Sequence, residues 1–241
     1  DIIISLGWEP WLESLLSKSG NANYSEIKCA GLGEWNIPSG AVSYVHAITT
    51  GLKSALPEKS DTIQQNADAY ETAINETASE LQNLLKTYNL TDRKVVSMEW
   101  QKDFLEWLGL NITHYYSPPE GLSVQDESKV IIAASHEDVS AIIDNLQSGT
   151  EFGARVASES GVSHVIFTNF PGAVPNTETY LDMITYNTDQ LIKGITSFDY
   201  ITDQTRELQD QLASSELQRN AFGITTIIAF TLCGILFTMY K

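Results

Sequence analysis

The sequence is poor in cysteine and in basic residues. Its two cysteines are Cys29 and Cys233, and the second lies in an apolar run near the end of the chain. Neither a disulfide scaffold nor a Cys-x-x-Cys metal site is therefore expected. Lys and Arg number 14 against 31 Asp and Glu, which gives a formal net charge of −17. Because affinity for phosphate backbones comes from Lys and Arg, we expect no nucleic-acid partner.

The sequence also lacks the short motifs of common enzymes. It contains no Gly-x-Ser-x-Gly, no phosphate-binding loop, no His-Glu-x-x-His and no Gly-rich dinucleotide turn. Cys29, the one cysteine outside the terminal apolar run, has no evident histidine partner for a thiol nucleophile. We therefore predict that the protein is not an enzyme, and we identify no certain cofactor.

One long run of the sequence carries no charge, residues 221–240. A bilayer core of about 30 Å requires about 20 apolar residues in a helix, and only a helix or a closed barrel satisfies the backbone there. The run is followed by Lys241 alone. It predicts a transmembrane anchor over residues 220–241, and thus a single-pass protein of the cell membrane with the lipid bilayer as a partner.

Four Asn-x-Ser/Thr sequons lie ahead of that run. They begin at Asn23, Asn75, Asn89 and Asn111, and they are glycosylation candidates. Glycosylation at such sites belongs to the secreted side of a membrane. We therefore expect residues 1–218 to be extracytoplasmic and the short C-terminus to be cytoplasmic.

Apolar periodicity predicts the elements of the remaining chain. Residues 1–6 form a predicted strand, and Gly7 ends it. A helix of roughly thirty residues is predicted over 58–88, where apolar residues recur every three or four positions. Further strands are predicted at 26–31, 94–98, 111–116 and 164–168, and further helices at 8–16, 42–52, 101–108, 123–134, 139–146, 151–160 and 177–195. Strands that alternate with helices imply a parallel sheet covered on both faces.

Several stretches of the sequence, taken in order, resemble one known family. They are the opening Asp1–Leu12, Trp35-Asn-Ile-Pro, Asn66-Ala-Asp-Ala-Tyr, Val95-Val-Ser-Met-Glu-Trp with Leu108-Gly-Leu after it, and Thr179-Tyr-Leu-Asp-Met-Ile-Thr-Tyr-Asn. Their order and spacing over residues 1 to about 192 are similar to those of the metal-specific solute-binding proteins of ABC importers, the zinc and manganese class.

The resemblance implies an α/β, two-lobed solute-binding fold with parallel sheets and a long linking helix. Because the chain opens inside a strand, we expect the N-terminal lobe to be incomplete. The predicted division is 1–57 for the remainder of that lobe, 58–93 for the linking helix, 94–195 for the C-terminal α/β lobe, 196–219 for a helical stalk and 220–241 for the anchor.

The metal ligands of the resembled family are changed in this sequence. Two of its histidine positions fall on Gly33 and Met98, a third would lie ahead of Asp1, and its carboxylate position falls on Thr168 or Asn169. Methionine is a poor donor for Zn²⁺. The adjacent Glu34 and Glu99 are therefore weak metal candidates, although lone loop carboxylates are more often simply solvated.

Other side chains at these positions are candidates for contact with a ligand between the lobes. They are Trp35, Trp100 and Asn169, together with Met98 and the two glutamates, and Trp100 is equally compatible with a place in the core. His46, His114, His136 and His164 do not pair at helical spacing, so we expect each of them to be structural.

These features predict a membrane-anchored extracytoplasmic solute-binding protein of an ABC importer. The expected cargo is a metal ion or a metal-containing solute, so a divalent metal ion is a candidate ligand, and the expected partner is an ABC permease. The alternative is a non-transporting accessory or scaffold subunit of another integral membrane complex that keeps the fold and has lost the ligand.

Overall fold

Residues 94–167 form a four-stranded parallel sheet with its connecting helices in the computed structural model, which describes residues 1–20, 23–29, 31 and 33–239, with backbone only over 227–239. The strands are β3 (Lys94–Met98), β4 (Asn111–Tyr116), β5 (Val139–Asn145) and β6 (Ser163–Phe167). They lie in the order β4-β3-β5-β6, and every neighbouring pair is parallel. The predicted parallel sheet is therefore confirmed.

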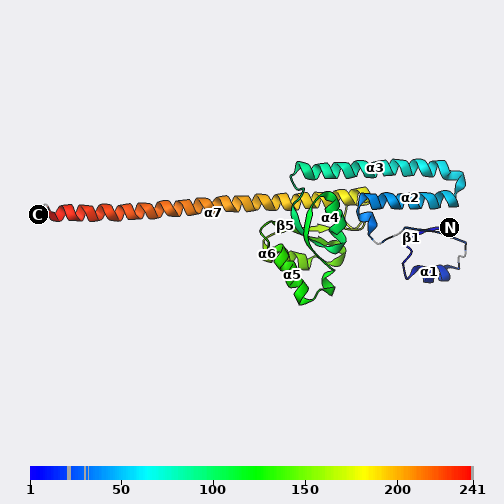
Figure 1. The fold of residues 1–241 in the computed structure, drawn as a ribbon, viewed down its shortest axis with the longest axis horizontal. Helices are drawn as coiled ribbons and strands as arrows, with labels where there is room; N and C mark the ends of the chain where they lie inside the picture. The colour runs from blue at the N-terminus through cyan, green and yellow to red at the C-terminus, as the bar shows by residue number, and fades with distance from the viewer. Residues whose placement is uncertain (21–22, 30, 32, 240–241) are drawn as a thin grey trace. The chain divides into compact units, whose positions relative to one another are not determined.

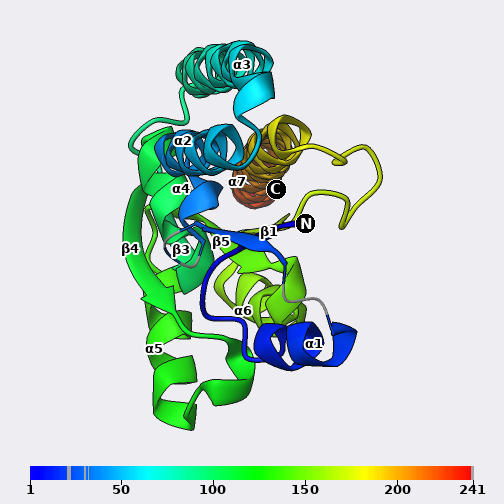
Figure 2. The same cartoon turned by 90° about the vertical axis from the view of Figure 1, so that its right-hand side faces the viewer.

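Helices cover both faces of this sheet. One face packs against α3 (Ser60–Thr87), α4 (Lys102–Leu108) and the first turns of α7 (Tyr180–Met239). The other face packs against α5 (Val124–Ala134) and α6 (Glu151–Ser160). Figure 2 shows α6 on one side of the strands and the start of α7 on the other.

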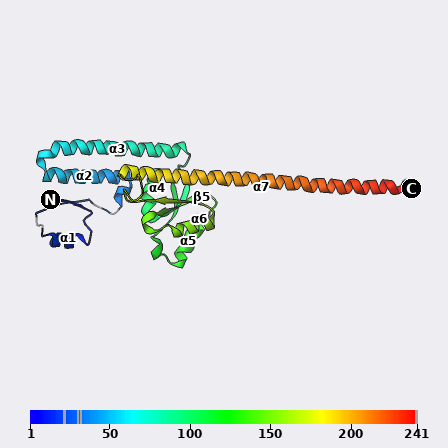
Figure 3. The same ribbon diagram turned by 180° about the vertical axis from the view of Figure 1, so that it is seen from behind.

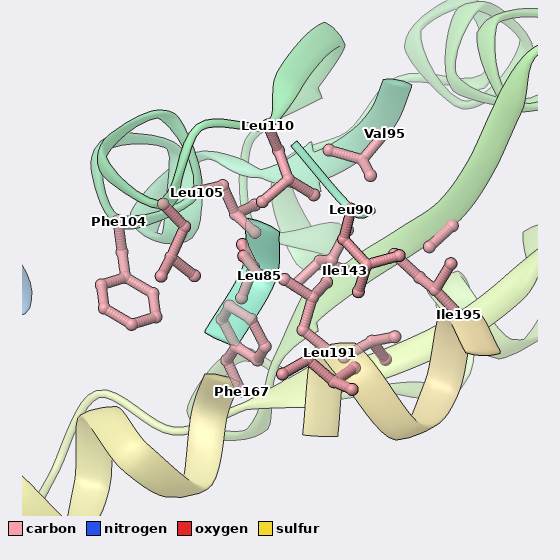
Figure 4. Close-up of a cluster of buried hydrophobic side chains, with 14 of the residues drawn as sticks. Leu85, Leu90, Val95, Phe104, Leu105, Leu110, Ile143, Phe167, Leu191 and Ile195 are labelled. Atoms are coloured by element: carbon pink, nitrogen blue, oxygen red, sulfur yellow. The ribbon is translucent and has the colours of Figure 1, made fainter. Parts of the chain in front are cut away.

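The two faces are set by alternation along the strands. Val95 and Ile143 belong to one buried cluster, whereas Val96 and Ile142 belong to the other. Successive side chains of a strand point to opposite faces, so a central strand covered on both sides is apolar throughout. Figure 4 shows Ile143 and Phe167 of the sheet among leucines from the helices of the first face.

Strand β5 corrects one predicted element. Residues 139–146 are predicted as a helix, but Val139–Asn145 is a strand that is buried along its whole length. Periodicity cannot separate a short buried strand from a buried helix, and here the β-branched residues were the better guide. As a strand, β5 lies between β3 and β6 and parallel to both. Its C-terminal end therefore lies at the sheet edge where the other strands also end.

The first part of the chain has a smaller parallel pair. It consists of β1 (Ile2–Ser5) and β2 (Ser25–Lys28), with α1 (Leu12–Ser19) between them. The 3₁₀ turn η1 (Glu34–Asn36) then leads into α2 (Pro38–Ala55), where Pro38 takes the first helical position.

Helices α2 and α3 lie side by side, as Figure 1 and Figure 3 both show. His46 on α2 lies 2.8 Å from Glu71 on α3, and Lys53 donates to Gln64 at 2.8 Å. The 3₁₀ turn η2 (Pro57–Lys59) connects the two helices. A helix close to the predicted thirty residues is therefore present, while its role as a link between lobes stays a prediction.

Short 3₁₀ turns follow three strands of the larger sheet. They are η3 (Glu99–Gln101), η4 (Pro119–Gly121) and η5 (Leu146–Ser148). Two compact units are present, Asp1–Ile195 and Thr196–Lys241, and α7 runs from the first into the second. The predicted closing helix and stalk are thus parts of one helix.

The predicted membrane localisation is corrected by the structure. Within the part of the chain that is described, no helix is both long enough and apolar enough to cross a bilayer. The described side chains of α7 beyond Ile195 are rich in Asp, Glu, Gln and Arg as far as Asn220, and those of residues 221–226, at the start of the apolar run, follow them. The remainder of the run, residues 227–241, lies outside the described side chains.

Candidate functional site

A small cavity lies where the strands of the larger sheet end. It measures about 140 Å³ and is lined by Gly33, Trp35, Asn36, Trp100, Asn145, Gln147, Ser148, Asn169 and Phe170. Trp100 follows β3, Asn145 ends β5, and Asn169 follows β6. Ligands of open α/β sheets bind in this place, beyond the carboxyl ends of the strands.

The turn η1, which lies ahead of the larger sheet in the chain, brings Trp35 to the cavity. Gly33 precedes this turn with a left-handed backbone at φ 82°. A Cβ on Gly40 would lie 1.8 Å from the carbonyl oxygen of Glu34, so only glycine lets α2 begin this close to the turn. The Trp35 Nε1 donates to the Asn169 carbonyl oxygen at 3.0 Å, and this bond ties η1 to the loop after β6.

Three aromatic residues, Trp35, Trp100 and Phe170, line the cavity. The Trp35 ring lies 6.3 Å from the ring of Phe170 and 6.0 Å from that of Tyr44, measured between centroids. Trp100 keeps 41% of its surface exposed, although a tryptophan normally gains by burial. An exposed indole beside two further rings leaves apolar surface for a ligand to cover.

Side-chain amides also line the cavity, and several of them take part in one hydrogen-bond network. The Gln147 Oε1 accepts from Asn145 Nδ2 and from the Asn169 backbone N–H, both at 3.1 Å. The Gln147 Nε2 donates to Thr168 Oγ1 at 2.9 Å. The Asn169 Oδ1 accepts from Gln101 Nε2 at 2.9 Å. This network holds the loops after β3, β5 and β6 to each other.

A second amide pair anchors the loop after β6 to the core. The Thr168 backbone N–H donates to Asn187 Oδ1 at 3.0 Å, and Asn187 Nδ2 donates to the Thr168 carbonyl oxygen at 2.8 Å. Both residues are buried. Buried polar groups whose bonds are all made rigidify the structure around them.

A buried carboxylate lies directly before the lining residue Asn145. Asp144 is fully buried, and its Oδ1 accepts from the Tyr116 hydroxyl at 2.5 Å. The Oδ2 lies 2.7 Å from His164 Nε2. Burial, and then the neighbouring Asp144 carboxylate, raise the pKa of Tyr116 far above its ordinary value, so the phenol stays a donor.

No residue that lines the cavity carries a charge. Its polar groups are amides, a serine hydroxyl and the backbone, and the others are aromatic rings or glycine. Among the residues that the structure describes, no three His, Cys, Asp or Glu side chains come together as a metal site. A zinc site requires three or four such donors, so the described side chains do not form one.

The structure brings together three of the predicted site residues, since Trp35, Trp100 and Asn169 all line the cavity. Met98 is instead fully buried, and its sulfur accepts from the Trp100 backbone N–H at 3.4 Å.

The two glutamates do not line the cavity. The Glu34 carboxylate lies against Gly31, and Glu99 accepts from the Ser117 hydroxyl at 3.1 Å. Binding by any of the predicted site residues stays a prediction, as does glycosylation at the four sequons, whose asparagines are all exposed.

The sequence does not single out the amides of the loop after β5 as site residues. Because residues 139–146 are predicted as a helix, the polar turn 144–149 is interpreted as a helix C-terminus, with a position facing the cleft as the alternative. Polar residues that directly follow a buried apolar run would have identified them, since such residues in a parallel sheet come to the ligand-binding edge.

A larger hollow of about 560 Å³ lies beside the β1–β2 pair, and three of the four charged residues that line it, Glu9, Glu26 and Lys28, are already engaged. Glu9 accepts from the backbone N–H groups of Leu6 and Trp8, which lowers its pKa. Glu26 accepts from the Ser5 hydroxyl and lies 3.5 Å from the Lys28 ammonium. The hollow is therefore a weaker candidate than the cavity at the strand ends.

Comparison with known proteins gives a family and a fold. The family described as zinc-uptake complex component A, periplasmic (ZnuA), matches residues 2–194. The Cd-bound periplasmic metal binding protein from candidatus liberibacter asiaticus is similar, with a TM-score of 0.65 and 17% identity over 81% of this chain and 80% of that chain. Its Mn-bound form has a TM-score of 0.65 and 16% identity, over 81% of this chain and 80% of that chain. The SBP FpvC in complex with Ni²⁺ from P. aeruginosa has a TM-score of 0.66 and 17% identity, over 82% of this chain and 78% of that chain. No curated protein matches the chain.

Proposed function

The chain belongs to the family of the periplasmic zinc-uptake complex component A, and on this premise we propose that it is the solute-binding component of an ABC importer that takes up a metal. The family consists of transport binding proteins rather than enzymes. Its members work with a membrane permease, so the proposed partner is a permease of the ABC type.

The cavity at the strand ends is the observation that carries this proposal. Its lining comes from η1 in the first part of the chain and from the loops after β3, β5 and β6. A solute-binding protein holds its ligand between two such groups of loops, where ring faces and a few placed polar groups decide which solute fits. The volume of about 140 Å³ suits a small solute.

The solved relatives support a metal as the cargo. Those proteins are solved in Cd-bound, Mn-bound and Ni²⁺-bound forms. The predicted site residues Trp35, Trp100 and Asn169 all line the cavity, although the imidazole and carboxylate donors of the resembled family are not among its lining residues. No observation favours the accessory-subunit alternative.

Deletion of the gene in its source organism tests the proposal. Elemental analysis of metal-limited cells should show that the cellular content of one divalent metal is lower in the deletion strain. Expression of the wild-type chain should restore that content. A chain with both Trp35→Ala and Trp100→Ala should not restore it, provided that it accumulates to the wild-type level. Unchanged contents of every divalent metal would contradict the proposed function, whatever form the cargo takes.

A further inference from the structure

Resting on the proposed function, we propose that the cargo is a metal ion already held in a small, electrically neutral chelate, rather than a bare divalent cation. The donor atoms of the chelate would supply the coordination sphere. The cavity would recognise the organic part through ring faces and amides.

The charge of the cavity is the first argument. Its lining residues are all neutral at pH 7. Removing a dication from water without a nearby opposite charge costs far more free energy than contacts with neutral amides recover. Asp144, the carboxylate next to Asn145 in the chain, accepts from Tyr116 and pairs with His164. A cargo that carries its own negative charges avoids this cost.

The second argument is that the amide oxygens are already used. Gln147 Oε1 accepts two hydrogen bonds, and Asn145 Oδ1 accepts from the backbone N–H and the hydroxyl of Ser148 at 3.0 and 3.1 Å. Asn169 Oδ1 accepts from Gln101. Coordination of a hard cation by these oxygens would break the network that holds the three loops.

The positions of the altered ligands give the third argument. Met98 is fully buried in the core, and its sulfur accepts a backbone N–H. Gly33 has a left-handed backbone that a side chain would strain. Thr168 is buried, and its hydroxyl accepts from Gln147. None of the three is placed to complete the shell of a bare ion, and each has a structural role instead.

The rings of the cavity suit a chelate that contains a flat group. Trp35, Phe170 and the exposed Trp100 present aromatic surface at one place. Such faces stack on planar groups, for example the imidazole of a chelating histidine. The 1:2 complex of Zn²⁺ with histidine is electrically neutral and serves as the probe. The cavity of about 140 Å³ is partly open to solvent, so it would hold one of the two histidines while the other stays outside.

Calorimetry on the full chain compares four titrants: Zn²⁺ alone, Mn²⁺ alone, histidine alone and the preformed zinc–histidine complex. We expect the complex to bind at least tenfold more tightly than any of the other three. Trp100→Ala should weaken binding of the complex by about fivefold, which is the size of one lost aromatic contact. Trp11→Ala is the matched control, because Trp11 is 60% exposed and does not line the cavity.

Three results would overturn the inference. Tighter binding of bare Zn²⁺ or Mn²⁺, lost in Glu34→Ala or Glu99→Ala, would show that the neighbouring carboxylates hold a bare ion. Equal binding of histidine alone would show an organic cargo, and no binding of any titrant would exclude this chelate class. The cellular metal content of the deletion strain distinguishes each result from failure of the proposed function, because it responds to uptake in any form.

Discussion

His164 Nε2 on strand β6 lies 2.7 Å from Asp144 Oδ2 on the neighbouring strand β5. The carboxylate is fully buried, and the next residue in the chain, Asn145, lines the cavity. A buried carboxylate is tolerated when its oxygens are paired and bonded. The pair therefore fixes the end of the central strand, and with it one wall of the candidate site.

Loss of the His164 ring should destabilise the protein. His164→Ala leaves Asp144 buried with the bond from the Tyr116 hydroxyl but without its imidazole. We expect the free energy of unfolding to fall by about 2–3 kcal/mol, less than the full cost of an unpaired buried charge because the imidazole is partly exposed. Urea unfolding measures this change in the free energy of unfolding. His136→Ala is the control, because the exposed His136–Asp138 pair should contribute less than about 1 kcal/mol. Equal losses in the two variants would contradict the role given to His164.

Gly153→Ala should disturb the same carboxylate from the helix side. A Cβ at this position of α6 would lie 2.0 Å from Asp144 Oδ2, and neither group can move freely in a packed core. We expect a destabilisation of about 1–3 kcal/mol, the usual cost of overpacking. Gly121→Ala, where a Cβ meets nothing within 4 Å, is the control in the same thermal unfolding experiment. A Gly153→Ala protein as stable as that control would refute the close approach.

Gln147→Ala should weaken ligand binding more than it weakens the fold. The side chain bonds to Asn145, Thr168 and the Asn169 backbone, so its loss frees the loops after β5 and β6. With the zinc–histidine complex as the titrant, we expect about tenfold weaker binding, which corresponds to one or two lost hydrogen bonds. Gln125→Ala, at an exposed position of α5, is the matched control. Circular dichroism should show both proteins folded, and unchanged affinity in Gln147→Ala would count against the network.

The Asp126 carboxyl, in the first turn of α5, should titrate at unusually low pH. The pKa of Asp126 is lowered to about 2, first by the bond from the Lys129 ammonium and then by the Ser123 hydroxyl. A lowered pKa means that the ionised carboxylate stabilises the helix above its unfolded pKa and loses this effect as the pH falls through 2. NMR titration should show the pKa rise toward its ordinary value in Lys129→Met. No movement of the pKa in that variant would contradict the contact.

The sequence alone was enough to predict the α/β class and the parallel strands at 94–98 and 111–116. It also singled out three residues that line the cavity, Trp35, Trp100 and Asn169. Apolar strands separated by polar turns leave a local pattern in the sequence. The three cavity residues were identified through the motifs that resemble the family. The strand Val139–Asn145 left no such pattern, because both of its faces are buried and alternation disappears. Asn145 and Gln147 were missed for the same reason.

Only the tertiary structure could decide which polar residues meet. Asp144, Tyr116 and His164 are spread over three strands, and no local periodicity relates them. The same holds for Trp35 and Asn169, which are 134 residues apart in the chain and joined by one hydrogen bond. The sequence determines each element through local apolar spacing. The register of the parallel strands determines the site, because it brings their carboxyl ends to one edge and sets amides and rings, rather than charged groups, around the cavity.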